Sequence, residues 1–136
     1  MVKSKTSKIL LIQGREKDSK FLKQAIHEKY PEMYIQTFKG LLDAFKTIVS
    51  GGYDLIIIDC EAQGFTNFAG IKLIKSFNDS VPILVTCTEE QKFLGMKSVI
   101  EGADNYYIIR YDYQRMFCKI ISIILNLANP IDQIKH

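Results

Sequence analysis

The stretch YDLIIIDCE, residues 53–61, places four branched apolar residues directly before a lone aspartate. Consecutive apolar residues are typical of a parallel strand that helices cover on both faces, because an exposed face would carry polar residues at alternate positions. Asp59 then stands where this strand ends. It is either an ordinary turn residue or a carboxylate presented at the mouth of a site.

Four further runs of strand length flank this one, and stretches with helical period separate them. The five strand-like runs are KILLIQ (8–13), MYIQTF (33–38), DLIIID (54–59), PILVTC (82–87) and NYYIIR (105–110). The helical stretches are marked by Phe21, Leu22, Ala25 and Ile26; by Leu41, Leu42, Phe45, Ile48 and Val49; by Ile71, Leu73, Ile74 and Phe77; by Phe93, Leu94, Met96, Val99 and Ile100; and by residues 113–127. Strict alternation with right-handed crossovers predicts an α/β fold, a doubly wound five-stranded parallel sheet in order 2-1-3-4-5.

Residues at the expected helix ends agree with these boundaries. Asp18 or Ser19 is a suitable N-cap for the first helix. Gly51, Gly52 and Gly102 stand where helices should stop, because glycine accepts the left-handed conformation that follows many helices. Pro130 is expected to end the last helix.

Length and composition indicate one domain of ordinary charge. The chain has 136 residues, 47% of them hydrophobic, and a net charge of +3. We expect a basic N-terminal tail at 1–7, a domain at 8–128, and a tail or the start of a linker at 129–136. No apolar run approaches the roughly 18 residues of a membrane span, and the start lacks a signal-peptide cleavage site, so a cytoplasmic protein that does not enter the membrane is expected.

The three cysteines and two histidines form no motif of known chemistry. Cys60, Cys87 and Cys118 lack CxxC spacing, so we interpret them as reduced thiols. The chain contains neither a GxGxxG or P-loop phosphate motif nor a GxSxG nucleophile elbow. We therefore expect no enzymatic activity.

In an open parallel sheet, ligands bind beyond the carboxyl ends of the strands. That rule selects the residues that follow four of the predicted strands, namely Gln13 and Gly14, Asp59 and Cys60, Thr86 and Cys87, and Ile109 and Arg110. Asp59 lies at the centre of this set.

Four motifs in this order resemble the receiver domain of two-component response regulators, a flavodoxin-like, CheY-like fold. They are KILLIQGRE (8–16), YDLIIIDCE (53–61), VPILVTCTEE (81–90) and EGADNYYIIRY (101–111), and the resemblance spans about residues 8 to 127. It implies that Asp59 stands at the phosphoacceptor position, which takes a phosphoryl group from a histidine kinase with the help of Mg²⁺. It also implies that Thr86 is the hydroxyl that bonds the phosphoryl group and that Tyr106 is the switch aromatic.

Two family positions are not matched. The acidic pair that binds the metal aligns with Gln13 and Gly14, and the lysine of the fifth strand aligns with Ile109, followed by Arg110 where proline is usual. Phosphoryl transfer depends on neutralising charge, and Mg²⁺ prefers carboxylate oxygens, so these changes should weaken metal binding steeply.

Metal is therefore not expected, and the weak candidate ligands are Asp59, Glu16 and Glu61. Arg110 would replace the lysine only if the strand slipped, because neighbouring strand residues point to opposite faces. Burial should raise the pKa of Asp59, whereas a hydrogen bond from Thr86 or a backbone N–H should lower it.

Two other features have alternative interpretations. The segment EAQGFTNFAG (61–70) is longer than in the family, and Phe65 and Phe68 either contact a partner or fold over the pocket. Four tyrosines near the fifth strand are either a protein-binding face or partly core: Tyr106, Tyr107, Tyr111 and Tyr113.

The sequence predicts an atypical receiver domain in phosphorelay signalling that acts mainly as a protein-interaction module with a degenerate acidic pocket. The alternative is a working receiver, phosphorylated on Asp59 by a histidine kinase with Mg²⁺ as cofactor. Expected partners are a histidine kinase or another signalling protein, with a possible output domain after residue 128. Nucleic-acid binding through the basic first helix is the less favoured third possibility.

Overall fold

The computed structural model describes residues 7–62, 68–112 and 114–126. In these ranges strands and helices alternate as the sequence predicts. The elements are β1 (Lys8–Ile12), α1 (Glu16–Lys29), β2 (Tyr34–Phe38), α2 (Leu41–Ser50), β3 (Leu55–Asp59), α3 (Ala69–Phe77), β4 (Ile83–Cys87), the 3-10 turn η2 (Glu89–Gln91), α4 (Lys92–Ile100), β5 (Asn105–Ile108) and α5 (Arg115–Ile124). Each strand lies within the apolar run that predicted it, and β5 ends two residues before its run does.

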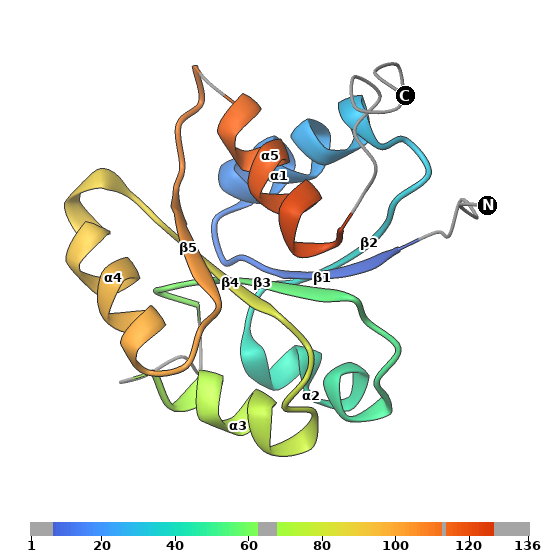
Figure 1. The fold of residues 1–136 in the computed structure, drawn as a ribbon, viewed down its shortest axis with the longest axis vertical. Helices are drawn as coiled ribbons and strands as arrows, with labels where there is room; N and C mark the ends of the chain where they lie inside the picture. The colour runs from blue at the N-terminus through green and yellow to red at the C-terminus, as the bar shows by residue number, and fades with distance from the viewer. Residues whose placement is uncertain (1–6, 63–67, 113, 127–136) are drawn as a thin grey trace.

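The strands form one sheet in the order β2-β1-β3-β4-β5, and every neighbouring pair is parallel. The predicted fold class and strand order are therefore confirmed. Figure 1 shows α1 and α5 on one side of the sheet and α2 and α3 on the other, with α4 beside β4 and β5. Parallel strands that are covered on both faces explain why the apolar residues occur consecutively.

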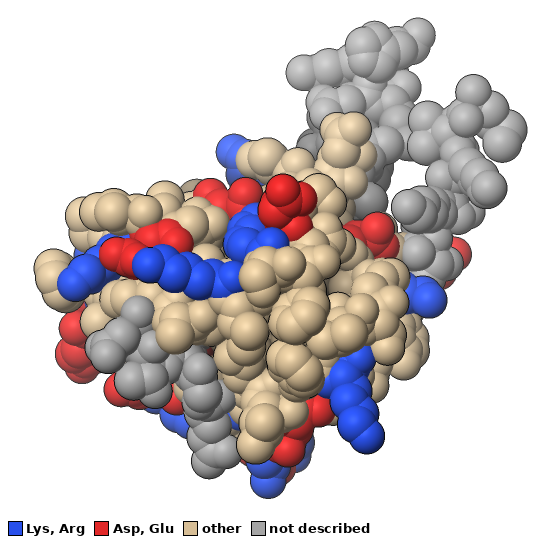
Figure 2. All heavy atoms as spheres, turned by 90° about the horizontal axis from the view of Figure 1, so that it is seen from below, with Lys and Arg blue, Asp and Glu red and all other residues tan. Residues whose placement is uncertain are grey.

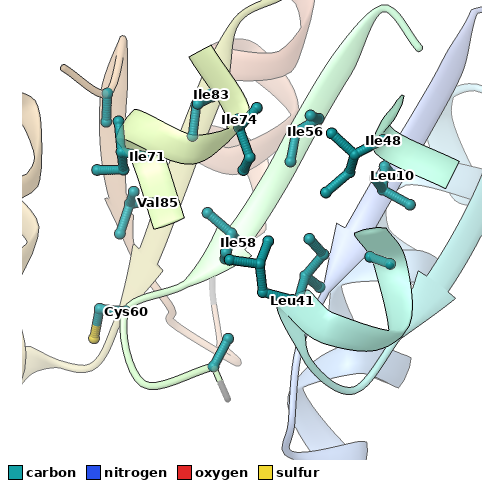
Figure 3. Close-up of a cluster of buried hydrophobic side chains, with 14 of the residues drawn as sticks. Leu10, Leu41, Ile48, Ile56, Ile58, Cys60, Ile71, Ile74, Ile83 and Val85 are labelled. Atoms are coloured by element: carbon teal, nitrogen blue, oxygen red, sulfur yellow. The ribbon is translucent and has the colours of Figure 1, made fainter. Parts of the chain in front are cut away.

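Alternating residues of each strand enter two separate cores. The α2–α4 core, shown in Figure 3, includes Leu10, Leu41, Ile48, Ile56, Ile58, Ile71, Ile74, Ile83 and Val85. The α1–α5 core on the other face includes Ile9, Leu11, Leu22, Ile26, Leu55, Ile57, Leu84, Phe117 and Ile121. Because successive strand side chains point to opposite faces, one apolar strand such as β3 supplies both cores.

The beginning of α1 differs from the prediction. The helix starts at Glu16 with Arg15 in the N-cap position, and Asp18 lies in its first turn with only 2% of its surface exposed. The prediction that Asp18 or Ser19 caps the helix was wrong. Asp18 instead forms an ion pair with the N-cap residue Arg15, three positions earlier, and rules for side-chain capping do not consider such a pair.

Two helix ends agree with the prediction. Gly51 follows α2 with φ 76° and donates its backbone N–H to the Ile48 and Thr47 carbonyl oxygens. Gly102 follows α4 with φ 123°. Residues with a side chain rarely adopt these φ angles, which explains why glycine occupies both positions. Pro130 lies outside the described residues.

Helix α4 does not bury the face that its apolar pattern predicts. Phe93 and Ile100 are 70% and 82% exposed, whereas Gly95 and Ser98 are buried against the sheet. A Cβ on Gly95 would lie 2.7 Å from Cδ2 of Tyr106 and within 3 Å of a neighbouring sulfur. The helix therefore approaches β5 closely, and the approach requires small residues rather than large apolar ones.

In the part of the chain that the structure describes, no helix is long and apolar enough to cross a membrane. The domain limits, with tails at 1–7 and 129–136, stay predictions, since most residues of both tails lie outside the described ranges.

Candidate functional site

Three polar side chains meet at the carboxyl edge of the sheet. The register pairs Asp59 with Thr86, and it pairs the last residue of β1 with Ile58, so that Gln13 follows β1 beside Asp59. On each of these strands the residue two positions earlier belongs to the α1–α5 core. Because side chains two positions apart in a strand point to the same face, all three side chains lie on the side of the sheet that α1 covers.

Asp59 is held by two hydrogen bonds from its surroundings. The backbone N–H of Glu61 donates to Oδ2 at 3.0 Å, and the hydroxyl of Thr86 donates to Oδ1 at 3.2 Å. The residue is only 2% exposed. Burial raises the pKa of Asp59 above its ordinary value, and the Glu61 N–H, the Arg15 guanidinium, the nearby Gln13 amide and the Thr86 hydroxyl offset part of that rise.

Gln13 occupies the position where the receiver resemblance implies a carboxylate. Its Nε2 donates to Oγ1 of Thr86 at 3.4 Å, and its Oε1 accepts the backbone N–H of Arg15 at 3.5 Å. Thr86 is fully buried, so its hydroxyl links Gln13 to Asp59 in a closed hydrogen-bonded row. A neutral amide therefore completes the row, and Gly14 adds no side chain to it.

A cation that the sequence analysis missed lies beside this row. Nη2 of Arg15 lies 3.9 Å from Oδ1 of Asp59, and Nε of the same guanidinium lies 3.0 Å from Oδ2 of Asp18. The rule that selects residues after a strand stops one position short of Arg15. Its length and charge were the signal that could have identified it, because an arginine at that position can reach back over the strand ends.

Three other residues that the sequence analysis selected do not contact Asp59. Arg110 pairs with Glu89 at 2.8 Å, and Glu16 pairs with Lys20 at 3.2 Å on the surface. Ile109 packs at the margin of the α1–α5 core. The structure therefore does not bring Arg110, Glu16 or Ile109 to Asp59.

The donor set around Asp59 does not fit a Mg²⁺ site. Mg²⁺ requires several hard oxygen ligands in octahedral geometry. Both oxygens of Asp59 already accept hydrogen bonds, Gln13 supplies a neutral amide, and an arginine stands 3.9 Å away. Over the described residues, no cluster of three or more His, Cys, Asp or Glu side chains is placed to hold a metal ion. The expectation that the chain needs no cofactor stays a prediction.

The aromatic residues fall on different sides of the sheet. Tyr106 is paired with Val85 in the register and packs against the α2–α4 core beside Gly95, on the face opposite to the Asp59 row. Tyr107 is buried in the α1–α5 core, and Tyr111 stacks edge-on against Phe21. Tyr113 lies outside the described residues.

Phe68 is only 9% exposed and belongs to the α2–α4 core, so it is not a free partner contact. Phe65 lies outside the described residues.

The cysteines near the site have the character of core residues. Cys60 and Cys87 are buried, and burial raises the pKa of their thiols to about 12 and about 11. Thiols in this state have little thiolate at neutral pH and react slowly. Both are free cysteines, which agrees with their interpretation as reduced thiols.

Comparisons with known proteins point to one family. No protein-family model matches the chain. It is 21% identical over 120 residues to the transcriptional regulatory protein CusR of Escherichia coli K12, covering 86% of this chain and 51% of CusR. The chain thus spans about half the length of the curated relatives it matches.

Solved structures of similar shape agree. A two-component response regulator from Clostridium difficile superposes with a TM-score of 0.71 at 23% identity, over 89% of this chain and 97% of that one. The receiver domain of Francisella response regulator 1452 has a TM-score of 0.74 at 17% identity, over 89% and 98%. The resemblance to response regulator receiver domains is confirmed, and at these identities the structures establish the fold.

Proposed function

We propose that this chain is an atypical receiver domain in two-component signalling that acts mainly as a protein-interaction module. Asp59 is not routinely phosphorylated in this proposal, because its pocket is closed by the side chains of the chain itself. The proposal takes its signalling context from the response regulators that the chain resembles.

The observation that carries the proposal is the environment of Asp59. A phosphoacceptor needs an accessible carboxylate and a divalent cation that neutralises the incoming phosphoryl group. Asp59 is 2% exposed and hydrogen-bonded at both oxygens, and the end of β1 supplies an amide and an arginine in place of carboxylates. These features oppose attack on a phosphodonor and oppose metal binding.

The outer surface of α4 supports the interaction role. Phe93, Met96 and Ile100 follow one another at positions i, i+3 and i+7, and they are 70%, 50% and 82% exposed. Such a stripe on a helix is suited to contact with another protein rather than to solvent. A groove of about 370 Å³ lies between β5 and α5, lined in part by Tyr106 and Met116.

A working receiver that is phosphorylated on Asp59 is the alternative. The test is incubation of the full chain with acetyl phosphate or phosphoramidate and Mg²⁺, followed by intact-mass spectrometry. We expect no stoichiometric gain of a phosphoryl group. A gain of one group that disappears in Asp59→Asn would refute the degenerate-pocket proposal and establish the working receiver.

Nucleic-acid binding through α1 has less support. Lys20 pairs with Glu16, and Lys17 lies over the ring of Tyr111 at 4.6 Å, so two lysines of α1 are engaged within the chain. Figure 2 shows the face on which α2 and α3 lie, and Lys and Arg side chains there also lie among Asp and Glu side chains rather than in a patch of one sign. Salt-sensitive DNA affinity at low ionic strength would be required to revive this function.

A further inference from the structure

Two buried carboxylates share one arginine at the carboxyl edge of the sheet. Asp18 comes from the first turn of α1 and Asp59 from the end of β3, and each is 2% exposed. Arg15 lies between them, with Nε 3.0 Å from Asp18 and Nη2 3.9 Å from Asp59. The contact with Asp18 is a close ion pair, and the contact with Asp59 is a longer one.

The charge balance of this group depends on Arg15. Burial raises the pKa of both carboxyl groups, and in each case the Arg15 guanidinium acts in the opposite direction. Lys17 also favours the ionised form of Asp18. Among the described residues, Arg15 is the only cation whose ion pairs reach both carboxylates.

The guanidinium is suited to this position for two reasons. It stays charged at any physiological pH and has five N–H donors in a fixed plane, so it can serve two carboxylates at once. Asp18 fixes its orientation, and Gln13 accepts the Arg15 backbone N–H at 3.5 Å, which ties the residue to the end of β1. The arginine is therefore held in place from two sides although its side chain is 48% exposed.

We infer that Arg15 is the resident cation of the Asp59 site, positioned by Asp18, and that it neutralises the two buried carboxylates in place of a divalent metal. The pocket is consequently independent of Mg²⁺. The inference rests on the proposed function in taking Asp59 as a group that stays ionised and unmodified. It concerns charge within the chain, so it can fail while the phosphorylation test still supports the proposed function.

The test is a double-mutant cycle on the full chain, measured by urea unfolding at neutral pH. Arg15→Gln is made in the native background and in the Asp59→Asn background, and again in the Asp18→Asn background. Because Arg15 is half exposed, we expect a coupling of about threefold with Asp59 in the unfolding equilibrium constant and a larger coupling with Asp18. Arg15→Lys should retain part of each coupling, since it keeps the charge.

Two further measurements separate charge from packing. The coupling with Asp59 should shrink at high NaCl concentration, because salt screens a half-exposed pair. The matched control is Arg110→Gln, the same substitution at an exposed arginine that pairs with Glu89, and its coupling with Asp59→Asn should be close to one.

The outcomes are distinct. Coupling of threefold or more, together with an unfolding midpoint of the unmodified chain that millimolar Mg²⁺ leaves unchanged, supports the inference. A coupling factor within twofold of one for either carboxylate would overturn it. A midpoint that rises saturably with Mg²⁺ would also overturn it, since a metal would then be the cation of the site.

Discussion

Two pairs of strands meet at the carboxyl edge of the sheet and differ in how well they match a receiver domain. One pair is β3 and β4, and the other is β1 and β5. β3 and β4 supply Asp59 and Thr86, the residues that the receiver resemblance implies at these positions, and a hydrogen bond joins them. β1 and β5 lead to Gln13 and Ile109 where that resemblance implies charges. The sheet register thus keeps the shape of the site while individual side chains change its charge, so the fold and the chemistry of such a site are separable.

The largest expected effect lies at the β3–β4 side of the comparison. Thr86→Val keeps the shape of the side chain but removes the hydroxyl that donates to Asp59 and accepts from Gln13. Because both partners are buried, we expect a loss of about 2 kcal/mol in the free energy of unfolding. Chemical denaturation measures it.

Thr37→Val is the matched control, because Thr37 is exposed on β2 and its replacement should change stability by less than about 0.5 kcal/mol. Equal effects at the two threonines would show that the hydrogen-bonded row does not stabilise the domain.

A smaller effect is expected at β5, where Tyr106 packs closely against Gly95 of α4. Gly95→Ala places a Cβ within 2.8 Å of both Tyr106 and Cys87, so α4 or the ring must move. Overpacking outweighs the helix propensity that alanine adds, and we expect a net loss of about 1 kcal/mol. Thermal unfolding measures the loss, and the double variant Gly95→Ala with Tyr106→Leu should recover part of it. A stabilised Gly95→Ala protein would mean that α4 is not held closely against β5.

The third prediction concerns pH. The pKa of Asp59 is raised above 3.8, so between pH 3.8 and the higher folded-state pKa the native protein binds more protons than the unfolded chain. The contribution of Asp59 to the free energy of unfolding therefore falls as pH rises through that window. Asp59→Asn removes this contribution, so the unfolding temperature of the variant relative to the native protein should increase from pH 3.8 towards neutrality.

The control for this titration is Thr37→Val, an exposed substitution that removes no ionisable group, and its unfolding temperature relative to the native protein should stay constant with pH. A parallel offset of Asp59→Asn across the whole range would contradict the raised pKa.

The smallest effect is expected at Arg110, the cation that does not reach the site. Its pair with Glu89 is exposed at both side chains, and exposed pairs contribute little. Arg110→Ala should change the free energy of unfolding by less than about 0.5 kcal/mol and leave the Asp59 titration unchanged. NMR titration of the carboxyl region checks the second point, and a shifted titration would place Arg110 back in the site.

Much of the fold could be predicted because its cause is local. Runs such as residues 55–58 are apolar at every position, as a strand that is buried on both faces requires. The pattern failed at α4, where Phe93 and Ile100 are exposed and Gly95 faces the sheet. Apolar spacing cannot distinguish a face buried in the core from one left for another protein, and it does not register a close helix–strand approach.

The sequence predicted the residues at the centre of the site but not the charged residues beside them. Asp59 and Thr86 follow directly from strand ends and register. The role of Arg15 was missed because its contact with Asp59 depends on how the start of α1 lies over the sheet, which is a tertiary arrangement. An aspartate near a helix start was interpreted as a cap because capping is the commoner local use of that residue.

Gly14 has a consequence for how this chain could change by mutation. A Cβ there would meet only the Lys39 carbonyl oxygen, at 3.6 Å, which is an ordinary contact, so packing does not demand glycine. Arg15 already places a positive charge beside Asp59, with Nη2 3.9 Å from Oδ1, so a carboxylate gained at position 14 would not by itself remove the charge that opposes a metal ion. We therefore expect the effect of such a substitution on metal affinity to depend on whether Arg15 is present. Such dependence is epistasis that arises from a single guanidinium.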